Sequence, residues 1–225
     1  MSAKIPPPPA LKVWDLPTRL FHWSLVILVI VSSFTGLTGK EMDCHMRAGY
    51  AILALIIFRL AWGFVGSQTA RFSDFIKPPG SALAYAKSLI SGKHIWTTGH
   101  NPLGGYMVLL LLLLLAVMTA AGLFANDDIL TEGPLARHVS GATSSLLTKI
   151  HKLSYWALLG AVVMHISAAL FYLLVKKENL ISAMFTGKKS LSPENTPPQP
   201  FFINPWLALG ILIVAGAIVW RVVKF

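Results

Sequence analysis

The chain has 225 residues, of which 55% are hydrophobic and 12% are charged, and its mean hydropathy is +0.64. Soluble domains carry about 25% charged residues, so these values exclude a soluble domain, a disordered tail and a collagen-like chain. The single cysteine, Cys44, excludes an intrachain disulfide scaffold. The formal net charge of +10 comes from scattered basic residues rather than a basic stripe, which argues against nucleic-acid binding. We therefore expect an integral membrane protein surrounded by lipid.

Five stretches are long and apolar enough to cross a bilayer as helices. A hydrocarbon layer about 30 Å thick needs about 20 apolar residues in helical form. The expected spans are at about 20–39, 48–65, 104–125 and 151–175, with a fifth inside 201–225. The expected fold class is all-α, an integral membrane helical bundle with a four-helix core and a fifth, C-terminal transmembrane helix. Between the second and third spans, a short amphipathic segment at 82–89 is expected on the membrane surface.

The distribution of basic residues predicts the orientation, because cytoplasmic loops are enriched in Lys and Arg. An N-terminus inside the cell places twelve of them on the cytoplasmic side: Lys4, Lys12, Arg19, Arg59, Arg71, Lys77, Lys87, Lys93, Lys176, Lys177, Lys188 and Lys189. Seven then lie on the other side: Lys40, Arg47, Arg137, Lys149, Lys152, Arg221 and Lys224. The expected topology has a cytoplasmic N-terminus and a periplasmic C-terminus. A cleaved signal peptide is the competing interpretation of the first span, and the long polar N-terminus argues against it.

Four histidines lie in or at the ends of the expected spans: His22, His45, His151 and His165. Ionisable groups at membrane depth are costly and indicate function. The last two are fourteen residues apart on one helix, so they project from nearly one face about 21 Å apart. His45 matches the outer level of His151, and His22 matches the inner level of His165.

Two histidines at one level on different helices form an axial pair for a haem iron, so two pairs predict two haems. The absence of a Cys-x-x-Cys-His motif predicts non-covalent haem b. Taken singly, each histidine is more often an interfacial anchor or a packing residue. A metal permease is an alternative, although such a protein normally places carboxylates inside its spans, and none lies there. Gly49 and Gly160 are expected to let a flat macrocycle approach the backbone.

Several motifs resemble the prokaryotic cytochrome b561 family, which includes the b-type cytochrome subunits of nickel-iron hydrogenases. The matching segments are 13–23 (VWDLPTRLFHW), 44–50 (CHMRAGY), 58–66 (FRLAWGFVG) and 99–105 (GHNPLGG), together with the spacing of His151 and His165. The resemblance covers about residues 12–180. It implies an inner haem on His22 and His165 and an outer haem on His45 and His151. The chain then divides into a cytoplasmic segment (1–19), a dihaem membrane domain (20–180), a linker (181–200) and the fifth span (201–225).

Haem propionates need cationic partners, and the expected ones are Arg19 and Arg59 at the inner haem and Arg47 and Lys152 at the outer. Membrane-interface anchoring is the alternative role of these side chains. His100 is expected either to contact the inner haem edge or a quinone, or to cap the following helix. The fifth span is either an extra packing helix or a docking surface.

Bis-histidine haem has no open coordination position, so the expected activity is transmembrane electron transfer, with no catalytic residues. The resemblance implies that a membrane quinone is the substrate and that the chain lies in a bacterial inner membrane. The expected redox partner is a catalytic oxidoreductase subunit or a periplasmic cytochrome c, and an electron-carrier subunit is favoured over a stand-alone enzyme. The alternatives are a stand-alone superoxide:quinone oxidoreductase and, in another class, a haem or metal transport or binding protein.

Overall fold

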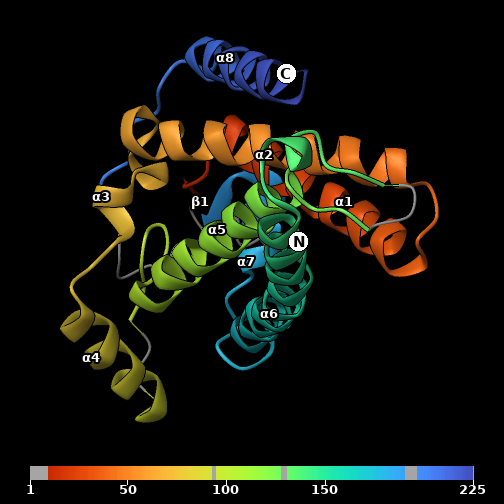
Figure 1. The fold of residues 1–225 in the computed structure, drawn as a ribbon. Coiled ribbons are helices and arrows are strands. Elements are labelled where there is room, and N and C mark those ends of the chain that lie inside the picture. Colours follow the sequence, from red (N-terminus) through yellow and green to blue (C-terminus); the bar gives the residue numbers. More distant parts are fainter. Residues whose placement is uncertain (1–9, 93–94, 128–130, 191–196, 225) are drawn as a thin grey trace, which may run out of the picture.

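The structure, a computed structural model, describes residues 10–92, 95–127, 131–190 and 197–224. Its α-helices are α1 (Leu16–Thr38), α2 (Met42–Val65), α3 (Phe72–Phe75), α4 (Pro79–Ile90), α5 (Pro102–Gly122), α6 (Gly141–Leu174), α7 (Leu180–Thr186) and α8 (Pro205–Val223). Short 3-10 turns, η1 (Gln68–Ala70) and η2 (Ala136–His138), and two short strands, β1 (Ala10–Lys12) and β2 (Lys188–Ser190), complete the described elements (Figure 1). The all-α membrane bundle is therefore confirmed.

Five of these helices, α1, α2, α5, α6 and α8, are long and apolar enough to cross a membrane. Many of their large apolar side chains point away from the bundle; Ile30, Phe34 and Val163, for example, are each more than half exposed. In water such a surface would be costly, whereas in a bilayer it faces lipid. The chain is a multi-pass membrane protein.

Helices α1 and α2 pack as one pair and α5 and α6 as another, and α2 joins the two pairs by packing on α5 (Figure 1). The central core consists of Ile52 and Ile56 from α2, Leu115 and Met118 from α5, and Leu158 from α6. Leu158 lies midway along α6 between His151 and His165. An apolar layer thus separates the two histidine levels.

Helix α6 is 34 residues long and begins at Gly141, before the expected span at 151–175. Ser140 caps it by accepting a hydrogen bond from the backbone N–H of Thr143 at 3.2 Å. The first turns are rich in Ser and Thr, so hydropathy alone does not reveal them. His151 consequently lies inside the helix rather than at its start.

The expected linker 181–200 contains ordered structure in its described part. Helix α7 is followed by β2, which pairs antiparallel with β1 in the register Leu11↔Lys189. The backbone N–H groups of Val13 and Trp14 also donate to the carbonyl of Gly187. The segments before α1 and after α6 are therefore fastened together at one end of the bundle.

Helix α8 packs on α2, on the side away from α6 (Figure 1). Its buried residues are Ala208, Ala215 and Val219, so small side chains let the two helices approach closely. The chain entering α8 is tied to the turn after α2, because Gln68 N–H donates to Phe201 O and Ile203 N–H donates to Ser67 Oγ, both at 3.1 Å. This helix is a packed part of the bundle.

Candidate functional site

The four histidines of the spans come together as two pairs. His45 of α2 and His151 of α6 have ring centroids 6.1 Å apart, and we call them the outer pair after the expected orientation. His22 of α1 and His165 of α6 have ring centroids 6.4 Å apart and are called the inner pair. Both pairings are those expected from the sequence. Helix α6 contributes one histidine to each pair, and α1 and α2 contribute the others.

Each imidazole of the outer pair is held by a backbone carbonyl of a neighbouring helix. The Nδ1 atom of His45 lies 3.0 Å from Ser32 O and 3.2 Å from Thr35 Oγ1, and the Nδ1 atom of His151 lies 2.8 Å from Met118 O. A carbonyl oxygen only accepts, so both Nδ1 atoms carry the hydrogen. This tautomer leaves the Nε2 lone pair of each ring available for a metal.

Two glycines make these contacts possible. Gly36 follows Ser32 by one helical turn and Gly122 follows Met118 by one turn, so each lies beside the carbonyl that accepts the histidine. A Cβ added at Gly36 would lie 3.0 Å from His45 Cε1, and one added at Gly122 would lie 3.0 Å from His151 Cε1. These glycines were missed in the sequence, although glycine inside an apolar helix is itself a signal of close packing.

The glycines expected to adjoin a macrocycle behave differently. A Cβ added at Gly49 or Gly160 would meet no atom within 4 Å. Gly49 lines a cavity of about 380 Å³ that also adjoins His45 and His151. This cavity is bordered by side chains of opposite charge, Lys152 and Asp127.

The inner pair is enclosed by aromatic side chains and by α7. The ring of His22 packs edge-on against Trp23 at 4.9 Å, and Trp23 stacks on Phe185 of α7 at 4.1 Å. Arg19 donates from Nη2 to Phe185 O. Among the described residues, the buried Nδ1 atom of His22 has no hydrogen-bond partner, and none of the hydrogen bonds reaches the His165 ring. Within the described residues, the inner pair therefore has no carbonyl contacts like those of the outer pair.

A buried cation lies on the inner side of α2. Arg59 is 2% exposed, and its guanidinium lies over the rings of Phe72 and Phe75 at 5.2 and 5.7 Å. Its Nη1 atom has no hydrogen-bond partner among the described residues. The buried carboxylate of Asp15 interacts electrostatically with Arg59. A buried donor atom without an acceptor is costly, so the Nη1 atom suits a further anionic group that is not part of the chain.

His100 is half-buried and lies between Trp14 and Phe75, with both ring centroids 4.7 Å from its own. Burial, followed by the positive field of Arg59, lowers the pKa of His100 to about 3, so its imidazole is neutral at pH 7. Its Nδ1 atom is buried and has no partner in the described chain. The backbone N–H of Gly104 is capped instead by Asn101 Oδ1 at 2.7 Å, which assigns the capping role to Asn101.

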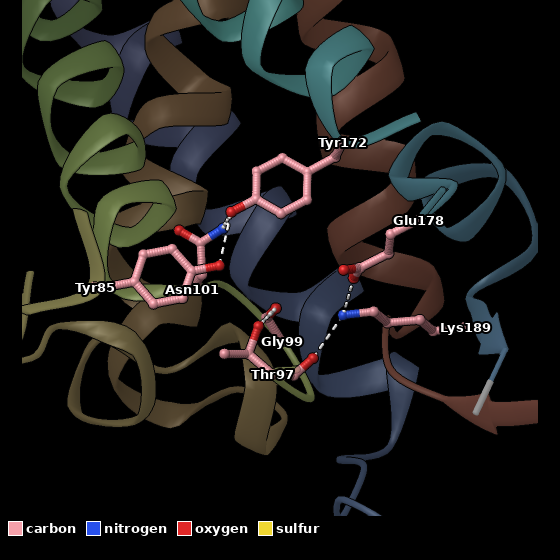
Figure 2. A network of polar contacts seen from close by, with 7 residues as sticks. All are labelled: Tyr85, Thr97, Gly99, Asn101, Tyr172, Glu178 and Lys189. Carbon is pink, nitrogen blue, oxygen red and sulfur yellow. Dashed lines mark hydrogen bonds and ion pairs between the residues drawn. The ribbon is translucent and has the colours of Figure 1, made fainter. Parts of the chain in front are cut away.

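Figure 2 shows a polar network between the loop before α5 and the end of α6. The hydroxyl oxygens of Tyr85 and Tyr172 lie 2.6 Å apart, and Asn101 Nδ2 donates to Tyr172 OH at 3.0 Å. Tyr172 is seven residues after His165, on nearly the same face of α6. Burial raises the pKa of Tyr85, which keeps its hydroxyl protonated. The network ties the short helix α4 to the helix that carries His165.

The second part of this network is an ion pair. Lys189 of β2 pairs with Glu178 and donates to Thr97 O at 2.6 Å (Figure 2). Burial lowers the pKa of Lys189, and the hydrogen bond to Glu178 opposes that effect. The sequence offered no pattern for this pair, because it depends on the pairing of β1 with β2.

Among the remaining expected cationic residues, Arg47 and Lys152 are exposed. Arg47 lines a separate surface hollow with Glu41 and Asp43. His138 is exposed in η2, and Cys44 is an exposed free cysteine. His94 lies outside the described residues.

The sequence profile of the prokaryotic cytochrome b561 family matches residues 13–187. The chain belongs to this family. It is therefore a membrane electron-transfer protein that uses b-type haem. The match runs from the segment before α1 to the end of α7, so α8 lies outside the part shared with the family.

Similar curated proteins are named probable Ni/Fe-hydrogenase B-type cytochrome subunits. The one from Azotobacter chroococcum mcd 1 is 28% identical over 215 residues, covering 79% of this chain and 88% of the relative. The one from Azotobacter vinelandii is 27% identical with the same coverage. The Ni/Fe-hydrogenase 1 B-type cytochrome subunit of Escherichia coli K12 is 23% identical over 222 residues, covering 79% of this chain and 90% of the relative.

Proposed function

We propose that this cytochrome b561 homologue binds two b-type haems, an inner one between His22 and His165 and an outer one between His45 and His151. The observation that carries the proposal is the separation of the paired rings, 6.4 and 6.1 Å. A nitrogen ligand lies about 2 Å from its metal and about 1 Å from the centre of its ring, so two imidazoles on one metal have centres about 6 Å apart. Both pairs fit this requirement.

The donor chemistry of the outer pair supports the same assignment. His45 and His151 hold Nδ1–H against carbonyls and present Nε2 to the space between them. When bound, an iron with two histidine ligands carries single electrons and has no free position for oxygen. The role of the chain is then to hold four imidazoles at two fixed levels.

The anionic propionates of the inner haem are assigned to Arg59 and Arg19. Arg59 has a buried Nη1 atom, and Arg19 a buried Nε atom, without a hydrogen-bond partner in the described chain. At the outer haem, Lys152 borders the cavity beside the histidines and is assigned one propionate. The orientation of Arg47 toward a different hollow makes it the least supported of the four cationic residues.

We further propose that the chain exchanges electrons between membrane quinone and a redox partner in a bacterial inner membrane, with its N-terminus in the cytoplasm. Curated relatives named as hydrogenase cytochrome subunits support a catalytic oxidoreductase subunit as that partner, with periplasmic cytochrome c as the other candidate. Two haems separated by about 21 Å along α6 connect the two membrane faces. An electron path between the two membrane faces requires a haem site near each face.

The test is the haem content and redox spectrum of the purified full chain in detergent. The expected result is two haems b per chain, both low-spin in the reduced-minus-oxidised spectrum and both reduced by a quinol. One haem per chain or none contradicts the proposal. Loss of haem from the protein during turnover indicates a haem carrier instead.

A further inference from the structure

Asp15 is a buried carboxylate with a hydrogen bond to each of its two oxygens. The residue directly precedes α1 and is 4% exposed. Its Oδ1 atom accepts from the backbone N–H of Thr18 at 2.7 Å, and its Oδ2 atom accepts from Trp62 Nε1 at 3.1 Å. The first bond caps α1, which is a common role of an aspartate at this position. The second bond comes from α2, and helix capping does not require it.

Arg59 lies three residues before Trp62 on α2, and the charge of Asp15 acts on its guanidinium. The two charges nevertheless do not pair directly. None of the ion pairs in the described part of the chain joins them, and the Nη1 atom of Arg59 has no hydrogen-bond partner there. A carboxylate and a guanidinium within electrostatic reach in an apolar interior gain most from direct contact. The bond from Trp62 accounts for their separation, because it occupies the oxygen that Arg59 would otherwise bind.

The indole of Trp62 is held in place by packing from two sides. It is fully buried and stacks on Phe58 of the same helix, with the ring centroids 6.0 Å apart. Ala208 and Ala215 of α8 belong to the same buried cluster. The indole therefore cannot follow the Asp15 carboxylate towards Arg59. This places α8, which lies outside the part shared with the family, behind the inner site.

We infer that Trp62 is a positioning residue of the inner haem site, which holds the Asp15 carboxylate away from Arg59 and so keeps the guanidinium free for a haem propionate. The inference rests on the proposed two-haem function and deepens it, since it names what keeps the cation of that site available. Asp15 still balances the buried positive charge from a distance before haem binds.

Phenylalanine at position 62 would keep an aromatic ring in the cluster but would donate no hydrogen bond. The Oδ2 atom of Asp15 would then be a buried acceptor without its donor, which favours a direct pair with Arg59. That pair competes with the propionate for the guanidinium. Because a hydrogen bond to a charged group is worth a factor of ten or more in an equilibrium, the inner haem should be released about tenfold faster.

The experiment measures the transfer of haem from the purified full chain in detergent to excess apomyoglobin. His151→Ala, which is expected to keep only the inner haem, assigns the phases of release to the two sites. Trp62→Phe should accelerate inner release about tenfold and leave outer release unchanged. Trp206→Phe in α8 is the matched control, since Trp206 is 73% exposed, and both of its rates should equal those of the wild type. Wild-type inner release in Trp62→Phe overturns the inference.

Asp15→Asn separates positioning from packing. Asparagine can still cap α1 through Oδ1 but carries no charge that would bind Arg59. In the Asp15→Asn chain, Trp62→Phe should therefore leave the rate of inner release unchanged. Equal acceleration by Trp62→Phe in both backgrounds would show that Trp62 acts only through packing, which also overturns the inference.

Asp15→Asn alone decides the question if Trp62→Phe does not fold. Its inner haem should be released no faster than that of the wild type, and faster release contradicts the inference, because the carboxylate would then support haem binding. Haem content is measured before any rate. A wild-type chain with fewer than two haems refutes the two-haem proposal, whereas two bound haems with the contrary rates refute only the role of Trp62.

Discussion

The two histidine pairs are constructed by different means. In the outer pair, carbonyls of the neighbouring helices α1 and α5 accept hydrogen bonds from the imidazoles. Gly36 and Gly122 leave room for the histidine rings beside these carbonyls. The inner pair is surrounded by aromatic rings, α7 and buried cations, and several buried polar atoms there have no hydrogen-bond partner in the part of the chain that the structure describes. The outer pair depends on close helix packing, whereas the inner pair depends on segments outside the long helices.

The largest expected effect is the loss of one haem with retention of the other. His151→Ala removes a ligand of the outer pair, so we expect one haem per chain with the inner one retained. His165→Ala should give the opposite result. Pyridine haemochrome assay and difference spectra measure both, and His138→Ala, an exposed residue of η2, is the control that keeps both haems. Retention of two haems in His151→Ala would contradict the assigned pairs.

Breaking the Lys189–Glu178 ion pair, which lies just beyond the end of α6 that carries His165, should weaken the inner site first. Glu178→Gln leaves Lys189 buried without its carboxylate, and removing one partner of a buried pair costs about 3–5 kcal/mol. We expect a lower thermal stability in detergent and loss of the inner haem before the outer one on heating. Simultaneous loss of both haems, at the wild-type temperature, would show that the pair does not support the inner site.

Lowering the pH should destabilise the protein through His100, which lies on the inner side of the bundle. The folded-state pKa of His100, about 3, lies below its unfolded value of 6.5, so the unfolded chain binds more protons between these values. Neutral His100 therefore contributes fully to the free energy of unfolding above pH 6.5. This contribution falls by up to about 1.4 kcal/mol per pH unit as the pH decreases towards 3. His100→Phe removes this dependence. Thermal unfolding of both proteins between pH 7 and pH 4 measures the difference, and parallel curves would contradict it.

The smallest expected effect concerns the tyrosine contact. Tyr85→Phe removes the hydroxyl that lies 2.6 Å from Tyr172, while Asn101 still donates to Tyr172. The loss of one buried hydrogen bond costs about 1 kcal/mol. We expect a small decrease in thermal stability with two haems still bound. Tyr106→Phe is a control, because Tyr106 bonds an exposed backbone carbonyl, that of Lys77.

The sequence predicted the spanning helices and the histidine pairs because both follow from helical periodicity. His151 and His165 share a face of one helix wherever that helix packs, and the levels of His22 and His45 follow from their places in their own helices. Arg59 also stood out, as a charge within an apolar run. These features are local, so hydropathy and spacing are sufficient to find them.

Contacts between distant segments were not predictable. Gly49 and Gly160 were chosen on proximity to histidines along the chain, whereas Gly36 and Gly122 contact the rings from other helices. The Lys189–Glu178 pair depends on a two-stranded sheet whose halves are far apart in sequence. Such contacts depend on tertiary packing, which one sequence does not encode in a periodic pattern.

The unbroken length of α6 has a consequence for the rate of charge movement. Because one rigid helix carries a histidine of each pair, the spacing of the two sites is a fixed number of helical turns. Electron tunnelling depends steeply on distance, and a bilayer that thins or thickens makes the helix tilt rather than stretch. If both pairs bind haem as proposed, α6 keeps the tunnelling distance between the two haems constant across membranes of different composition.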